Sequence, residues 1–149
     1  MKLNNPFAAE DFDMQDIRGD QYAAVKPAST ILRFEGLGYF VLACTLYQYL
    51  NFSWAQFVLY FFVPDIAILV YIFANARVGM YVYNLTHSSL GAALTGLLGI
   101  LLHEPLFFQI SLIWFAHIGF DRALGYGLKY PMGFRVTHLG VLKGMARKE

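Results

Sequence analysis

Four long apolar segments constrain this chain more than any other feature of its sequence. They run at about Ile31–Leu50, Trp54–Phe73, Gly79–Leu102 and Pro105–Tyr126. Each is close to the roughly 20 residues that a helix needs to cross about 30 Å of hydrocarbon. The chain is 58% hydrophobic and 14% charged, whereas a water-soluble domain normally carries about 25% charged residues. The pattern predicts an all-α fold, a polytopic membrane bundle of four helices that contacts the lipid bilayer.

The connections between these segments are short, which implies antiparallel neighbours, and the basic residues predict their orientation. Arg77 lies in the second connection and further Lys and Arg residues follow the fourth segment, whereas the first and third connections contain neither type. Basic residues favour the cytoplasmic side of a membrane. We therefore expect a multi-pass protein of the inner (plasma) membrane with both termini in the cytoplasm.

The two ends of the chain differ from the apolar part. Residues 1–29 are polar and acidic and lack the apolar stretch of a secretory signal, so they predict a disordered tail, with a short surface helix as the alternative. Residues 30–140 form the predicted membrane domain, and residues 141–149 form a basic tail. The net charge of +1 and the lack of a basic stripe with interleaved aromatics argue against nucleic-acid binding.

Ionisable side chains inside the four segments fall at one depth. In the predicted topology, Glu35, Asp65, His87, His117 and Asp121 lie within about two helical turns of one another along the membrane normal. Each segment contributes at least one of them, and His117 and Asp121 are one turn apart on the same helix. A charged side chain inside a span costs about 2.5 kcal/mol or more, so such groups pair with each other or with an ion. The sequence therefore predicts a polar cluster between the helices, near the cytoplasmic face.

A divalent metal is our main hypothesis for this cluster. Mixed carboxylate and imidazole ligands suit Zn²⁺, Mn²⁺ or Fe²⁺, and a metal with open positions can activate water for hydrolysis. We expect a metal-dependent hydrolase with a lipid or other membrane-proximal substrate such as a phosphoester, an anionic group of which Arg122 would hold. The candidate metal ligands are Asp65, His87, His117, Asp121 and Glu35, and the candidate catalytic residues are Glu35, Asp121 and Arg122.

Non-enzymatic alternatives stay open. The same residues could form a proton or metal-ion path, or a polar core that fixes helix packing in a structural or partner subunit. A path needs polar groups on both sides of the midplane, whereas the outer stretches Val41–Leu46 and Leu94–Leu102 are nearly apolar. That distribution favours a one-sided pocket. His138, beyond the last segment, lies either on a tail folded back over the site or at an ordinary surface position.

Several motifs carry a resemblance to a known family. The chain resembles small bacterial integral membrane proteins catalogued as domain of unknown function family 4260, over about Ile31 to Gly140. The resemblance implies the membrane fold and no particular activity. The segments that carry it are Leu32-Arg33-Phe34-Glu35-Gly36, Pro64-Asp65, Tyr83-Asn84-Leu85-Thr86-His87-Ser88, the long stretch Trp114–Tyr130, Gly133-Phe134 and Thr137-His138-Leu139-Gly140.

A more distant resemblance implies chemistry. Pro64-Asp65, Thr86-His87-Ser88 and His117 with Asp121 are similar, in the same order, to motifs of membrane-bound metal-dependent hydrolases of the damage-response-regulated type. The resemblance implies that Asp65, His87, His117 and Asp121 are metal ligands. That family has His-Arg-Gly where this chain has Val82-Tyr83-Asn84, and an early His where this chain has Glu35.

Overall fold

The computed structural model describes residues 26–130 and 133–141. Most of the predicted acidic tail and of the predicted basic tail lies outside the described residues. The expectation of an all-α fold class is confirmed, since the described chain is largely helical. The elements are α1 (Lys26–Tyr49), α2 (Trp54–Phe61), the 3₁₀ helix η2 (Val63–Ile66), α3 (Ala67–Phe73), α4 (Ala76–His87), α5 (Ser89–Leu102), α6 (Pro105–Leu124), β1 (Lys129–Tyr130), β2 (Gly133–Thr137) and β3 (Gly140–Val141).

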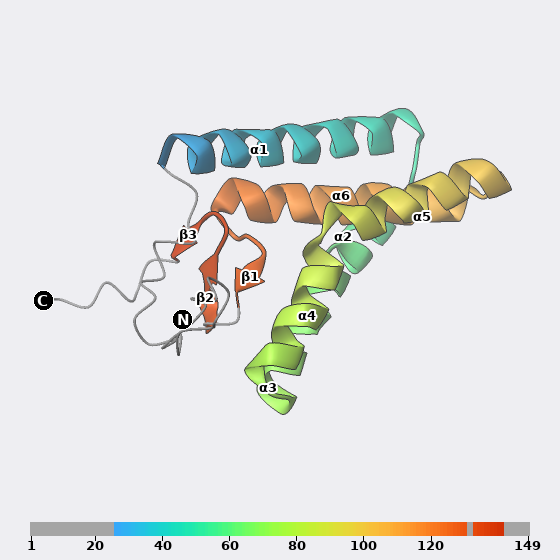
Figure 1. Ribbon diagram of the computed structural model, residues 1–149. Helices are drawn as coiled ribbons and strands as arrows, with labels where there is room; N and C mark the ends of the chain where they lie inside the picture. The colour runs from blue at the N-terminus through green and yellow to red at the C-terminus, as the bar shows by residue number, and fades with distance from the viewer. Residues whose placement is uncertain (1–25, 131–132, 142–149) are drawn as a thin grey trace, which may run out of the picture.

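Helices α1 and α6 lie side by side, and α5 packs along α6 (Figure 1). Two glycines bring α1 and α6 into backbone contact. A Cβ atom on Gly36 would lie 2.6 Å from Cβ of Arg122, and one on Gly119 would lie 2.6 Å from the backbone nitrogen of Phe40. Below this contact, Tyr47 of α1 and Ala116 of α6 pack with side chains of α2 in the buried core. This packing holds α6 firmly and so fixes the direction of its polar side chains.

The second and third apolar segments are not continuous helices. Pro64 lacks a backbone N–H and its ring disfavours an α-helix through that position, and the chain there passes through η2 between α2 and α3. At Ser88 the backbone is extended (φ −83°, ψ 136°), and the Ser88 hydroxyl accepts a hydrogen bond of 3.1 Å from the N–H of Leu90. This N-cap starts α5 in a new direction, bent by 42° from α4. Figure 1 shows α3 and α4 projecting away from the α1–α6 pair.

The breaks shorten the helices relative to the four predicted spans. Among the helices described, none is by itself both long and apolar enough to cross a membrane, but the bent pair Arg77–His87 with Ser89–Leu102 could do so together. The four-helix membrane bundle and its orientation therefore stay predictions.

The segment after α6 forms a small sheet that the sequence did not predict. Helix α6 ends at Gly125, which adopts a left-handed conformation (φ 95°), and the N–H of Tyr126 bonds the carbonyl of Asp121 at 2.8 Å. Glycine accepts this conformation without steric cost, so the chain can turn back here. It continues into an antiparallel sheet with the strand order β1-β2-β3. Because α6 ends one turn after Asp121, the sheet lies next to the polar end of that helix (Figure 1).

The contact between α1 and α6 can be tested with two glycines of the same helix. We expect Gly36→Ala to lower the free energy of unfolding by about 1–3 kcal/mol, because the added methyl group meets backbone and Cβ atoms of α6. Gly38→Ala is the matched control, since a Cβ at Gly38 has no atom within 4 Å. It should stabilise α1 by up to about 1 kcal/mol through helix propensity. Unfolding of the purified variants measures both effects, and equal stabilities would contradict this packing.

Candidate metal centre

Four of the predicted metal ligands come together at one point. Asp65 lies on η2 directly after Pro64, His87 is the last residue of α4, and His117 and Asp121 lie one turn apart on α6. One ligand atom from each of these four residues lies within 4.8 Å of the other three. The breaks in the second and third segments thus occur where Asp65 and His87 meet α6.

The distances between donor atoms resemble those around a small metal ion. Nε2 of His87 lies 3.2 Å from Nε2 of His117, 3.4 Å from Oδ1 of Asp65 and 3.5 Å from Oδ2 of Asp121. Nε2 of His117 lies 3.6 Å and 3.8 Å from the same two carboxylate oxygens. Ligands about 2.0–2.1 Å from a tetrahedral ion are separated by roughly 3.3–3.4 Å. The four donors therefore need only small shifts to bind one ion.

The contact of the His87 ring with Tyr83 favours the tautomer that a metal requires. Its Nδ1 atom lies 3.0 Å from the carbonyl oxygen of Tyr83 and 2.9 Å from the Thr86 hydroxyl, which can donate or accept. Because a carbonyl only accepts, the contact with Tyr83 favours a proton on Nδ1. The lone pair of Nε2 is then directed at His117, Asp65 and Asp121. The ring also stacks on Tyr83, with centroids 3.7 Å apart and planes inclined by 10°.

Burial divides the four donors into an inner and an outer pair. The imidazoles of His87 and His117 are 4% and 1% exposed, whereas the carboxylates of Asp65 and Asp121 are 32% and 16% exposed. His117 packs edge-on against the ring of Phe61. Its Nδ1 atom is buried and makes no hydrogen bond of good geometry within the described part of the chain. Within the described residues, the carboxylate side of this group is therefore the more exposed one.

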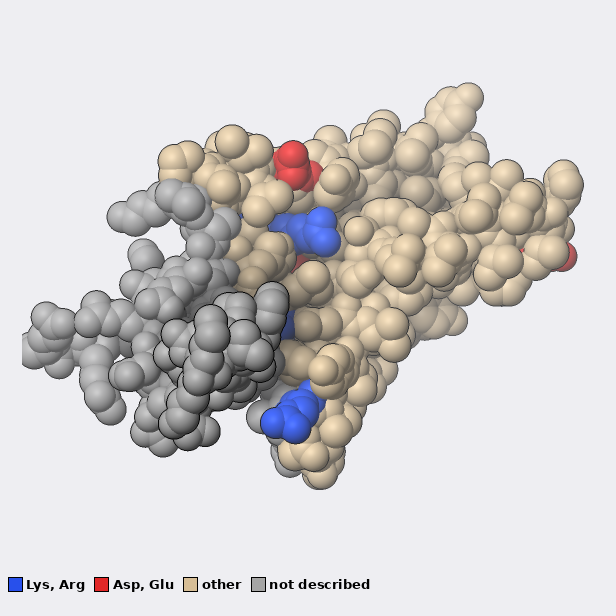
Figure 2. All heavy atoms as spheres, in the orientation of Figure 1, with Lys and Arg blue, Asp and Glu red and all other residues tan. Residues whose placement is uncertain are grey.

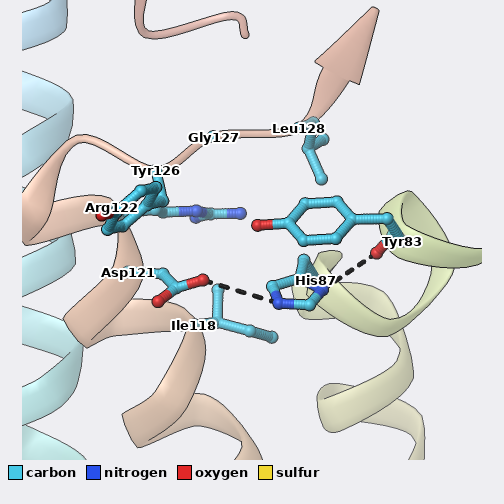
Figure 3. Close-up of a pocket in the computed structure, with 8 residues that line it drawn as sticks. All are labelled: Tyr83, His87, Ile118, Asp121, Arg122, Tyr126, Gly127 and Leu128. Atoms are coloured by element: carbon cyan, nitrogen blue, oxygen red, sulfur yellow. Dashed lines mark hydrogen bonds and ion pairs between the residues drawn. The ribbon is translucent and has the colours of Figure 1, made fainter. Parts of the chain in front are cut away.

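A small pocket adjoins this group (Figure 3). Its free volume of about 10 Å³ is enough for about one water molecule. Of the four donors, His87 and Asp121 line the pocket, and Asp65 and His117 do not. The pocket thus reaches one edge of the group. Its lining consists of Tyr83, His87, Ile118, Asp121, Arg122, Tyr126, Gly127 and Leu128.

The C-terminal sheet covers the pocket. The Asn84 side chain binds the backbone of Lys129 twice, donating from Nδ2 to the carbonyl at 2.9 Å and accepting the N–H at Oδ1 at 2.6 Å. Nδ1 of His138 accepts the N–H of Leu128 at 2.9 Å, and the N–H of His138 donates to the Leu128 carbonyl at 3.2 Å. Of the two alternatives for His138, the structure therefore has the tail folded back over the site.

This fold-back brings a buried cation to the site. Lys129 is 2% exposed, and its Nζ atom lies 4.8 Å from the centroid of the Tyr83 ring. Burial lowers the pKa of the Lys129 ammonium to about 8, although the Asp121 carboxylate favours the charged form. The site thus combines two imidazoles, two carboxylates and one amine.

The other two sequence candidates lie in different surroundings. Glu35 is exposed on α1 and is not part of the four-residue group. The adjacent Gly36 faces α6, and successive helical residues are rotated by about 100°, so Glu35 points away from the contact. Arg122 lines the pocket next to Asp121, and Figure 3 shows its side chain beside Tyr126. Within the described residues, the Arg122 side chain makes no hydrogen bond or ion pair, and its donors are available to a bound anion.

Sequence reasoning did not assign a role to two residues of the site. Tyr83 has a detectable signal, since it lies one turn before His87 on the same helix face. Lys129 has no such signal in the sequence, because its position depends on how the segment after Gly125 folds. Both residues contact the pocket or the groups that line it.

The structure thus defines a helical protein with a buried group of two histidines and two aspartates. Comparison with known proteins identifies its family. The chain belongs to the family described as domain of unknown function DUF4260, whose family model matches residues 29–142. This confirms the resemblance predicted from the motifs. No curated protein and no solved structure matches the chain, and the likeness to metal-dependent hydrolases stays a prediction.

The contact between His138 and Leu128 predicts a specific pH dependence. Burial, together with the nearby charge of Arg122, lowers the pKa of His138 below its usual value of 6.5. The folded state therefore favours the neutral ring. As the pH falls below about 6.5, the unfolded chain binds the proton first and the folded state loses stability. We expect wild type to lose unfolding free energy relative to His138→Asn as the pH falls from 8 to 5.

Asparagine is the appropriate substitution because its side-chain oxygen can accept the Leu128 N–H as Nδ1 does, but it does not titrate. Unfolding of both proteins at each pH measures the difference between them, in which the titration of the other histidines cancels. A difference that stays constant with pH would contradict the neutral, buried state of His138.

Proposed function

We propose that this protein is an integral membrane, metal-dependent hydrolase with one divalent ion bound by Asp65, His87, His117 and Asp121. The observation that carries the proposal is the convergence of four donor atoms from η2, α4 and α6 within 4.8 Å of one another. Two carboxylates and two imidazoles are a ligand set that suits Zn²⁺, Mn²⁺ or Fe²⁺. Two negative charges and the fixed lone pair of His87 favour a divalent cation over a network of hydrogen bonds alone.

The pocket beside the four donor residues gives water access to them, which supports a catalytic metal site over a closed structural one. Catalytic metal sites keep a position open to water or substrate, and the pocket reaches the His87–Asp121 edge with space for about one water. When bound, the ion would supply a Lewis acid that activates water. Asp121 lies at the border between the donor group and the pocket, where the carboxylate oxygen that does not bind the ion can take a proton from that water.

The charges around the pocket favour an anionic substrate. Arg122 lines the pocket beside Asp121, and the buried amine of Lys129 lies behind Tyr83. A guanidinium recognises the paired oxygens of phosphate or carboxylate through two parallel hydrogen bonds. A phosphate ester of a lipid or another membrane-proximal molecule matches this chemistry, since the partly exposed Arg122 can hold the non-bridging oxygens. The ester would lie over the pocket, whose free volume admits only about one water molecule.

The apolar surface supports the membrane location. Large apolar side chains are exposed along α1, α2 and α5, for example Leu42, Leu59 and Ile100, each more than half exposed. Monomeric soluble proteins rarely expose such continuous apolar area. On the face in Figure 2, most of the surface over α5 is uncharged. We infer that the apolar helices lie in the bilayer and that the pocket opens toward the cytoplasm.

Metal content provides the first test of this function. We expect the purified wild-type protein to bind one equivalent of Zn²⁺, Mn²⁺ or Fe²⁺ per chain, and His117→Ala to lose on the order of 100-fold in affinity, because a ligand is removed. His103→Ala is the matched control, since His103 is exposed at the end of α5 and is not part of the group. Elemental analysis and competition with a chelator measure both quantities.

Hydrolysis of phosphate mono- and diesters by the metal-loaded protein, in soluble and lipid form, should then be present in wild type and His103→Ala and absent in His117→Ala. Equal metal content in all three proteins would contradict the metal site. Bound metal without hydrolysis of any ester would contradict the enzymatic part of the proposal.

Membrane integration gives an independent prediction. The full-length chain should stay in the membrane fraction after an alkaline carbonate wash and require detergent for release, because its exposed apolar surface favours hydrocarbon over water. Reporter fusions at each terminus should both report the cytoplasm. Release by carbonate alone would contradict integration, and termini on opposite sides would contradict the four-span topology.

A further inference from the structure

We propose that Tyr83 is the positioning residue of the metal centre, because its carbonyl, ring and hydroxyl together orient the two ligands that line the pocket, His87 and Asp121. The proposal rests on the metal site proposed above and goes beyond it, since it assigns a role to a side chain outside the ligand set. Tyr83 is itself buried and lines the pocket.

The contacts with His87 fix both the tautomer and the plane of its ring. The Tyr83 carbonyl oxygen lies 3.0 Å from Nδ1 of His87 and accepts a hydrogen bond from it. The phenol ring stacks on the imidazole, with centroids 3.7 Å apart. The two residues are one turn apart, so their side chains lie on the same face of α4. Helix α4 ends at His87, and no following turn of α4 supports the ring. The stack with Tyr83 provides that support.

The contact with Asp121 connects α4 to α6. The Tyr83 hydroxyl donates a hydrogen bond to the Asp121 carboxylate, and Figure 3 shows the phenol reaching across the pocket from the helix that carries His87. A carboxylate that accepts this bond with one oxygen can direct its other oxygen toward the ion. Tyr83 therefore sets the relative position of two ligands that come from different helices.

Lys129 holds Tyr83 from the opposite side. The imidazole occupies one face of the Tyr83 ring at 3.7 Å, so the Lys129 ammonium, 4.8 Å from the ring centroid, lies over the other face. A cation over a phenol ring attracts its π electrons. The Lys129 backbone is fixed by two hydrogen bonds to Asn84, the neighbour of Tyr83 in the chain. The C-terminal sheet thus contacts Tyr83 through Lys129 and stabilises the position of its ring.

The hydroxyl can be removed without disturbing the other contacts. Tyr83→Phe keeps the carbonyl, the ring and the stack, and removes only the hydrogen bond to Asp121. Loss of an outer partner of a metal ligand typically costs 10–100-fold in affinity. Tyr81→Phe is the matched control, because Tyr81 belongs to the same helix and its side chain is exposed.

The test measures Zn²⁺ affinity by competition with a chelator, and the visible absorption of the Co²⁺-loaded protein, which reports the ligand geometry. We expect Tyr83→Phe to bind Zn²⁺ about 10-fold more weakly and to change the Co²⁺ spectrum, whereas Tyr81→Phe matches wild type in both. In an Asp121→Ala background, where the partner carboxylate is gone, adding Tyr83→Phe should change the affinity by less than about 2-fold.

A Tyr83→Phe protein with wild-type affinity and spectrum would overturn the role of Tyr83 while leaving the metal site in place. An undiminished effect in the Asp121→Ala background would also overturn it, because the hydroxyl would then act through another group. Thermal unfolding shows that each variant is folded before metal is added. A wild-type protein that takes up neither Zn²⁺ nor Co²⁺ would overturn the metal site, and this role with it.

Discussion

The placement of four ionisable side chains between helices, two of them buried and two partly buried, is the constraint on which the rest of this structure depends. Charged groups removed from water are costly unless each meets a partner. The two imidazoles and two carboxylates meet this condition by facing one another, within 4.8 Å. Such an arrangement needs donors from three elements at one point, and it needs a cation or shared protons to offset the two carboxylates. This requirement relates three features of the structure to one another: the helix breaks, the glycine contact and the C-terminal sheet.

The elements around the site have different roles. Helix α6 is the fixed part, because Gly36 and Gly119 allow α1 to pack directly against its backbone, and it supplies two donors from one face. The second and third segments are interrupted at Pro64 and Ser88, and these interruptions turn Asp65 and His87 toward α6. A continuous helix would have carried each side chain past the meeting point. Local loss of regular structure thus produces the site.

The distribution of polarity also relates the site to its surroundings. The outer surface of α1, α2 and α5 is largely apolar, whereas the polar groups concentrate at the end of α6 and under the sheet. Arg122 and Tyr83 line the pocket, and the Lys129 ammonium lies over the Tyr83 ring. Among the described residues, the pocket adjoins one edge of the donor group, at His87 and Asp121.

The sequence by itself determined the helical class, the family and the four residues of the donor group, among five candidates. Segment length and hydropathy are local properties, and the cost of buried charge made the common depth of Asp65, His87, His117 and Asp121 informative. Only the tertiary structure decided that Glu35 faces outward, since that depends on which side of α1 packs against α6. It also decided that the segment after Gly125 returns over the pocket with Lys129. Both outcomes depend on contacts between residues far apart in the chain. Hydropathy and residue spacing are local properties and do not predict such contacts.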